Sequence, residues 1–145
     1  DKIKGMKHFA NKLWNISRYV LANTESTQQL NTPEAQTEAD NEILAKLETV
    51  TKDTTKHIEE FRLHEAAQAL YQFAWYELAD IYIEASKPQL LDEKQKANTQ
   101  KILLYNLYTL LKLLHPFMPF VTEEIWSKLD QKKLLLVTPW PKEKD

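Results

Sequence analysis

The segment "LLKLLHPFMPFVTEEIW" (residues 110–126) places two prolines, three residues apart, between a leucine-rich run and an acidic run that ends in tryptophan. Pro116 has no amide hydrogen and its ring clashes with the preceding turn, so a helix must end near His115. Pro119 suits the first turn of a new helix, and the glutamates that follow favour the positive end of its dipole. The segment therefore predicts a corner between two helices, with its angle fixed by the prolines.

The composition of the whole chain favours helices. Its 145 residues are 43% apolar, which is enough for one buried core. One glycine and six prolines are too few turn formers for a β-rich chain, whereas the long stretches of Leu, Ala, Lys, Glu and Gln favour helix. We therefore expect an all-α fold: a bundle of about five helices over residues 1–130, followed by a short extended tail, residues 131–145, that packs through Trp140.

Two helices are predicted before the middle of the chain, because apolar residues recur at helical spacing over residues 2–22 and again from residue 38 to about residue 61. Thr37 and Asp40 can form a capping box at the start of the second helix. Polar residues dominate the stretch between the two helices, so we expect a solvated linker there. The segment "TVTKDTT" is a poor helix former, and we expect the middle of the second helix to fray.

A third apolar stripe begins at Leu63 and predicts a helix that ends near Lys87, because Pro88 disfavours the helical conformation in the residue before it. Asp92, together with Gln95, can cap the next helix. The leucines of that helix lead directly into the proline corner. The inward-facing positions predicted for the third helix include Leu63 and Ile81, and those of the fourth are Leu103, Leu104, Leu107, Leu110, Leu111 and Leu114.

The absence of cysteine excludes disulfides and thiolate metal sites and fits a reducing compartment. No run of 18 apolar residues and no signal-like amino terminus occur, so we expect a cytoplasmic protein that neither spans a membrane nor is exported. The chain opens inside a helical pattern, from which we expect it to be part of a longer protein.

Few residues suggest catalysis. His57, Glu60 and His64 share one predicted helix face, but a solvated face explains them better than a metal site. His115 has no nucleophile near it in the sequence and is read as a polar residue at a helix end. A single glycine also leaves no phosphate-binding loop of the usual kinds.

An acidic cluster on the third predicted helix can be interpreted in two ways, as a catalytic pair or as structural ion pairs. Glu77, Asp80 and Glu84, with Lys87 one turn on, could resemble an acid/base pair. Ion pairs that hold neighbouring helices together explain the same spacing with fewer assumptions. We therefore predict neither a catalytic nor a metal site in this chain.

The polar side of the first predicted helix offers a binding surface. Residues 1–18 carry a net charge of +4, whereas residues 23–65 carry −6, so a polyanion should approach the first helix. Lysine and arginine neutralise phosphates, and asparagine pairs with base edges that single-stranded RNA loops leave unstacked. An ordinary exposed helix face is the alternative. The residues of this RNA-binding row are Lys4, Lys7, His8, Asn11, Lys12, Asn15 and Arg18, with Tyr19 at its edge, where it could stack on a base.

Three segments carry a resemblance to a known family. Together, "FANKLWNISRYVL" (residues 9–21), "ALYQFAWYELADIYIEASKP" (residues 69–88) and the proline corner resemble the helical anticodon-binding domain of class I aminoacyl-tRNA synthetases, most closely the valyl-tRNA synthetases. Leucyl and isoleucyl members share the corner in looser form. The residues that match the valyl pattern are Asn11, Lys12, Trp14, Asn15, Arg18, Trp75, Glu77, Asp80, Tyr82, Glu84 and Lys87.

The resemblance implies a bundle that docks the anticodon arm of tRNA, next to an upstream catalytic domain of the same chain that uses ATP and Mg to join valine to tRNA. The His-x-Gly-His and Lys-Met-Ser-Lys-Ser motifs of that catalytic domain do not occur here. We therefore expect this chain to bind tRNA without catalysis and without a cofactor of its own, and to bind neither DNA nor membranes. The alternatives are the isoleucyl or leucyl relative and a helical protein-interaction module.

Overall fold

The computed structural model describes residues 2–24, 31–129, 135 and 138–141, with the backbone alone for residues 2–4 and 6. This part of the chain is helical and contains no strand, which confirms the all-α prediction. The elements are α1 (Lys2–Ala22), α2 (Glu38–Glu59), α3 (Leu63–Gln72), the π-helix η1 (Phe73–Ile83), α4 (Glu84–Leu91), α5 (Lys96–Leu114) and α6 (Pro119–Ser127).

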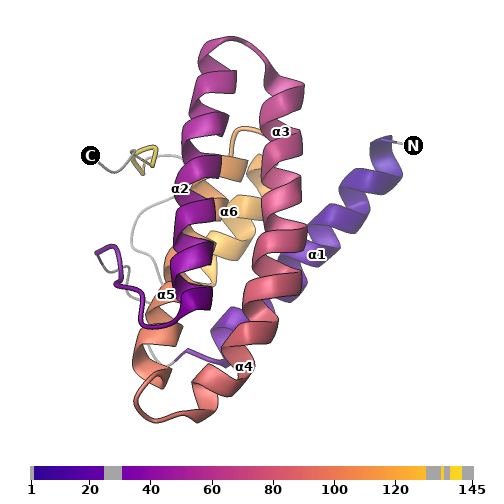
Figure 1. Cartoon of the computed structure of the whole chain (residues 1–145). Helices are drawn as coiled ribbons and strands as arrows, with labels where there is room; N and C mark the ends of the chain where they lie inside the picture. The colour runs from indigo at the N-terminus through magenta and orange to yellow at the C-terminus, as the bar shows by residue number, and fades with distance from the viewer. Residues whose placement is uncertain (1, 25–30, 130–134, 136–137, 142–145) are drawn as a thin grey trace.

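The described helices form five rods. The junction residues between α3, η1 and α4 keep right-handed helical φ and ψ angles, so these three elements run on as one long rod. Figure 1 shows this rod beside α2 as a hairpin, with α5 and α6 behind the pair. α1 crosses the bundle diagonally, and its N-terminal end projects beyond the other helices.

The core is centred on α5, most of whose residues are buried. All six leucines predicted to face inward on this helix are buried, as expected. Trp126 of α6 meets Tyr108 edge to face, with 5.4 Å between the ring centres. The prediction was wrong for Leu63 and Ile81, which are exposed. Leu63 is the first residue of α3, and Ile81 lies in the π-helix, where i to i+5 hydrogen bonding breaks the 3.6-residue period.

The predicted capping box at the start of α2 is confirmed. The Thr37 hydroxyl accepts a 3.0 Å hydrogen bond from the Asp40 amide, and the Asp40 carboxylate accepts one from the Thr37 amide. The expected fraying of the middle of α2 was wrong, because Thr51 and Thr54 are buried there. The Thr51 hydroxyl donates a 2.8 Å hydrogen bond to the Leu47 carbonyl, so it can be buried without losing its partner. Tertiary burial therefore outweighs the weak helix propensity of this segment.

The third predicted helix does not end at Lys87. It continues through Pro88, which lies inside α4, and ends at Leu91. Gln89, the residue after Pro88, explains why the helix continues. Its buried side chain donates to both Asp40 and Thr99 at 3.0 Å. These tertiary hydrogen bonds hold the last turn in place despite the amide hydrogen that proline lacks.

The predicted cap of α5 was also wrong. The Asp92 carboxylate accepts from the Lys94 amide at 2.9 Å within the preceding turn, and the N-cap residue, Gln95, makes no capping bond with its side chain. The first amides of α5 are instead bonded by backbone carbonyls, such as that of Asp92, which accepts from the Lys96 amide at 2.8 Å.

The proline corner has the predicted form. α5 ends at Leu114 with His115 as its C-cap, and Pro119 is the first residue of α6. The His115 ring nitrogen Nδ1 lies 2.9 Å from the Thr122 hydroxyl, so a side-chain hydrogen bond links the two helices across the corner. Beyond α6, Trp140 donates from its indole nitrogen to Thr55 of α2 at 2.9 Å. Most of residues 131–145 lies outside the described residues, so the extended tail stays a prediction.

Candidate nucleic-acid interface

The row predicted on the first helix lies on the surface of α1. The side chains of Lys7, His8, Asn11, Asn15 and Arg18 are all exposed. On the inward side of the same helix, buried apolar residues anchor α1 to the core; these are Phe9, Leu13, Ile16 and Val20. Spacings of three and four residues keep His8, Asn11, Asn15 and Arg18 on one side of the helix. The Lys4 side chain lies outside the described residues.

Arg18 is held in place by two neighbours on its own helix. One guanidinium nitrogen donates to Asn15 Oδ1 at 3.4 Å, and the guanidinium carbon lies 5.7 Å from the centre of the Trp14 ring. Trp14 is half-buried and packs against the core. The bond to Asn15 uses only one of five guanidinium N–H donors. The charge of Arg18 is therefore exposed and partly oriented.

Lys12 is engaged between helices. Its ammonium nitrogen lies 4.0 Å from the Asp80 carboxylate and 4.9 Å from the centre of the Trp75 ring, both on η1. The Trp75 ring stacks on Tyr71 at 5.4 Å, and Tyr71 in turn contacts Phe9 of α1 at 5.1 Å. These three rings join α1 to the long rod, and no local pattern predicts their alignment.

Two acids of the cluster on the long rod, Asp80 and Glu77, pair with lysines of neighbouring helices, as predicted, whereas Glu84 does not. Glu77 lies 3.9 Å from Lys46 of α2, which adds a second ion pair between helices. Glu84 pairs with Lys87 of its own helix at 2.8 Å, and this carboxylate raises the pKa of Lys87. Such exposed pairs contribute little stability individually, but they account for the acids without any catalytic role.

Tyr19 lies at the inner edge of the row and is half-buried. Its hydroxyl lies 2.9 Å from the Ser86 hydroxyl of α4. Ser86 is fully buried, so the tip of the Tyr19 side chain points into the bundle. This contact spans 67 residues of sequence, and no local pattern could have revealed it.

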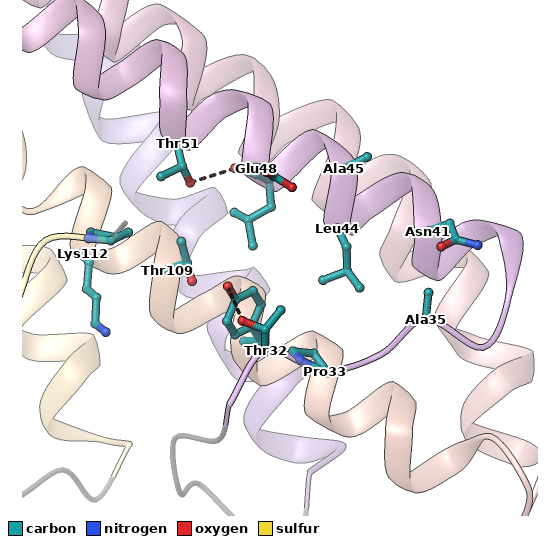
Figure 2. Close-up of a pocket in the computed structure, with 13 residues that line it drawn as sticks. Thr32, Pro33, Ala35, Asn41, Leu44, Ala45, Glu48, Thr51, Thr109 and Lys112 are labelled. Carbon is teal, nitrogen blue, oxygen red and sulfur yellow. Dashed lines mark hydrogen bonds between the residues drawn. The ribbon is translucent and has the colours of Figure 1, made fainter. Parts of the chain in front are cut away.

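One cavity lies away from α1. It has a volume of about 530 Å³ between α2, α5 and the segment that begins at Thr32. Figure 2 shows the Lys112 side chain pointing away from the threonines that line it. The Lys112 ammonium lies 6.0 Å from the Trp126 ring, and burial lowers the pKa of this lysine. Glu48 also lines the cavity, and its carboxylate lies 3.9 Å from the ammonium of Lys52, which lies outside the lining.

Among the described residues, no three or more His, Cys, Asp or Glu side chains gather in a way that could hold a metal ion. In the same part of the chain, no helix has both the length and the apolar character that crossing a membrane requires.

The fold agrees with the comparison to known families. Residues 40–145 match the family described as the anticodon-binding domain of tRNA ligase. The chain belongs to this family of anticodon-binding domains. This match confirms the resemblance deduced from the sequence.

The relatives of the chain narrow the family further. It is 46% identical, over 98% of its length, to the valine–tRNA ligase of Carboxydothermus hydrogenoformans, and 46% identical, over 97%, to that of Thermosynechococcus vestitus. It is also 45% identical, over 88%, to the valine–tRNA ligase of Xanthomonas oryzae. The chain spans only 16%, 16% and 13% of these three relatives, respectively.

A solved structure shares the fold. In the crystal structure of the ternary complex of Agrobacterium radiobacter K84 agnB2 LeuRS with tRNA and LeuAMS, the synthetase superposes on 97% of this chain with a TM-score of 0.76. This chain covers 17% of that synthetase, and the sequence identity is 20%. The likeness therefore supports the bundle architecture.

Proposed function

We propose that this chain recognises the anticodon arm of tRNA as the anticodon-binding part of a valine–tRNA ligase. The observation that carries the proposal is the exposed row of His8, Asn11, Asn15 and Arg18 on α1. These side chains project from a helix whose opposite side is buried, so the row is presented on a rigid support. The net charge of +4 over residues 1–18 adds attraction for a polyanion.

Each residue type in the row has a distinct role. Arg18 and Lys7 bind phosphates, while Asn11 and Asn15 donate to and accept from base edges. Lys12 is kept beside the row by Asp80 and Trp75, where its ammonium adds positive potential. Lys4 and His8 extend the same row, and Tyr19 borders it.

The remaining steps of the reaction belong to a longer protein. In this proposal, a catalytic domain of the same chain activates valine with ATP and Mg and transfers it to tRNA in the cytoplasm. The present residues contribute binding only, since they contain neither the His-x-Gly-His nor the Lys-Met-Ser-Lys-Ser motif. The described residues likewise offer no metal-holding cluster.

A titration with tRNA that bears a valine anticodon tests the proposal. Asn15→Ala and Arg18→Ala are each expected to weaken binding, because each removes an exposed contact from the row. Loss of one phosphate contact should also reduce the log–log salt slope by about one in Arg18→Ala, whereas Asn15→Ala should leave this slope unchanged.

Lys52→Ala provides a matched control. Lys52 is an exposed cation on α2 that pairs with Glu48 of the same helix, so its removal changes the net charge as Arg18→Ala does. We expect this variant to bind tRNA like the original chain. The proposal is overturned if Asn15→Ala and Arg18→Ala both remain folded and both keep the original affinity.

A further inference from the structure

The C-terminal end of α1 is tied to the bundle through Tyr19. The Ser86 hydroxyl donates to the Ile83 carbonyl at 2.7 Å, which uses its only proton. The Tyr19 hydroxyl must therefore be the donor in the 2.9 Å hydrogen bond with Ser86. Because Ser86 is fully buried, this donor points into the protein and not toward a ligand.

A second set of hydrogen bonds fixes the same end of α1. The Asn23 side chain donates to the Tyr19 carbonyl at 2.8 Å and so caps the last turn. The Asn23 carbonyl in turn accepts from the Gln100 side chain of α5 at 2.9 Å. The last turn of α1 is thus bonded to both α4 and α5, whereas Figure 1 shows its N-terminal end projecting away from the bundle.

Tyr19 lies one residue after Arg18 and four residues after Asn15. Residues four apart are neighbours on a helix surface, so the rotation of Tyr19 about the helix axis also sets the direction of Asn15. An α-helix turns through 360° in 3.6 residues, and a rotation equal to one residue would carry Asn15 about 100° away from its present direction. Rotation of α1 about its axis at Tyr19 therefore changes the direction of Asn15, at the centre of the row.

We infer that Tyr19 is a positioning residue for tRNA recognition, whose hydroxyl, bonded to Ser86, fixes the rotation of α1 and so aims Asn15 and Arg18 at the RNA. This inference rests on the proposed function. This role differs from base stacking, because the Tyr19 hydroxyl bonds a buried residue of the protein and the ring need not contact the RNA. Ser86, on the far side of the contact, becomes part of the recognition apparatus without touching RNA.

The test uses paired substitutions in the 145-residue chain. Tyr19→Phe keeps the ring and removes the donor, whereas Ser86→Ala removes the acceptor. Each variant is expected to weaken binding of tRNA with a valine anticodon by up to about three- to tenfold, because the orienting free energy that is lost cannot exceed that of one hydrogen bond. The double variant should bind no more weakly than the single variants, because both remove the same interaction.

Two readouts separate positioning from a general loss of stability. Tyr82→Phe removes another tyrosine hydroxyl bond, at a site that joins η1 to α2 rather than to α1. This control should lower stability while keeping the tRNA affinity. In addition, Tyr19→Phe should reduce the ratio of affinities for the valine anticodon and a swapped anticodon, because misaimed asparagines lose their contacts with base edges while the positive charge of the row is unchanged.

Several results would overturn the inference. The positioning role is refuted if Tyr19→Phe and Ser86→Ala keep the original tRNA affinity while Asn15→Ala binds more weakly. The proposed function is not affected by that result. A loss seen in Tyr19→Leu but not in Tyr19→Phe shows that the ring itself makes the contact. If Tyr19→Phe and Tyr82→Phe lose tRNA affinity equally, general destabilisation explains both losses and no positioning role is needed. If Asn15→Ala and Arg18→Ala also bind normally, the proposed function and the inference fail together.

Discussion

The Tyr82 hydroxyl donates a 2.7 Å hydrogen bond to the carboxylate of Asp40, 42 residues away in the sequence. The same carboxylate oxygen accepts from Gln89 at 3.0 Å, and the other oxygen accepts from the amides of Gln36 and Thr37. Asp40 is 1% exposed, so a buried charge is stabilised entirely by donors from neighbouring elements. The start of α2 is thereby joined to η1 and α4.

The substitution Tyr82→Phe is expected to lower the free energy of unfolding by about 1–3 kcal/mol, because the buried Asp40 carboxylate loses a donor. Urea denaturation measures the change. Tyr76→Phe is the matched control, since Tyr76 lies on the same π-helix and is exposed. An equal effect of the two substitutions would contradict this role of the Asp40 carboxylate.

The same hydrogen bond predicts a dependence on alkaline pH. Burial, followed by the hydrogen bond to Asp40, raises the pKa of Tyr82 far above its ordinary value of 10.0. A raised pKa contributes stability that is complete below pH 10 and is lost as the pH rises above it, because only the unfolded tyrosine ionises there. The stability difference between the original chain and Tyr82→Phe should therefore shrink above pH 10. A constant difference between pH 9 and 11 would refute the assignment.

Phe61 forms the turn between α2 and α3 in a left-handed conformation, with a φ of 60°. This conformation costs a residue with a side chain about 1–2 kcal/mol, and Phe61 is 89% exposed, so little packing compensates. Phe61→Gly should raise the free energy of unfolding by about 0.5–1 kcal/mol after the larger entropy of the unfolded glycine is subtracted. Leu63→Gly, at the first position of α3, should have the opposite sign, because a helical position gains nothing from glycine. Thermal unfolding distinguishes them, and a lower melting temperature for Phe61→Gly would count against the turn geometry.

Pro88 removes one helical donor within α4, the amide hydrogen that would reach the Glu84 carbonyl. Pro88→Ala restores this donor and should stabilise the protein by about 1–3 kcal/mol, as measured by thermal unfolding. Pro116→Ala, beyond the C-cap of α5, should gain much less. A loss of stability in Pro88→Ala would mean that the proline is needed to aim Gln89 at Asp40.

Local chemistry made part of the fold predictable from the sequence. Pro116 and Pro119 act on their own turns, and the Thr37 side chain reaches an amide only three residues away. The same holds for the exposed row, because the helical period alone places Asn11 and Asn15 together on one side of α1.

Contacts between residues far apart in the sequence determine the features of the fold that local patterns did not predict. Gln89 keeps α4 helical beyond Pro88 through Asp40, which comes 49 residues earlier. The Lys12 ammonium lies near Asp80 and Trp75 on a π-helix, and the apolar pattern of the sequence did not predict that π-helix. Such contacts depend on how whole helices pack, and local propensity contains no information about that packing.

The role of the α1 row in reading the anticodon is tested most directly by comparing two tRNAs that differ only in the anticodon. The affinity of the chain for each is measured at one salt concentration, with and without Asn15→Ala. We expect the original chain to prefer the valine anticodon, and Asn15→Ala to lose this preference while keeping the salt dependence. Equal affinities for the two tRNAs in the original chain, or an undiminished preference in Asn15→Ala, would contradict this expectation.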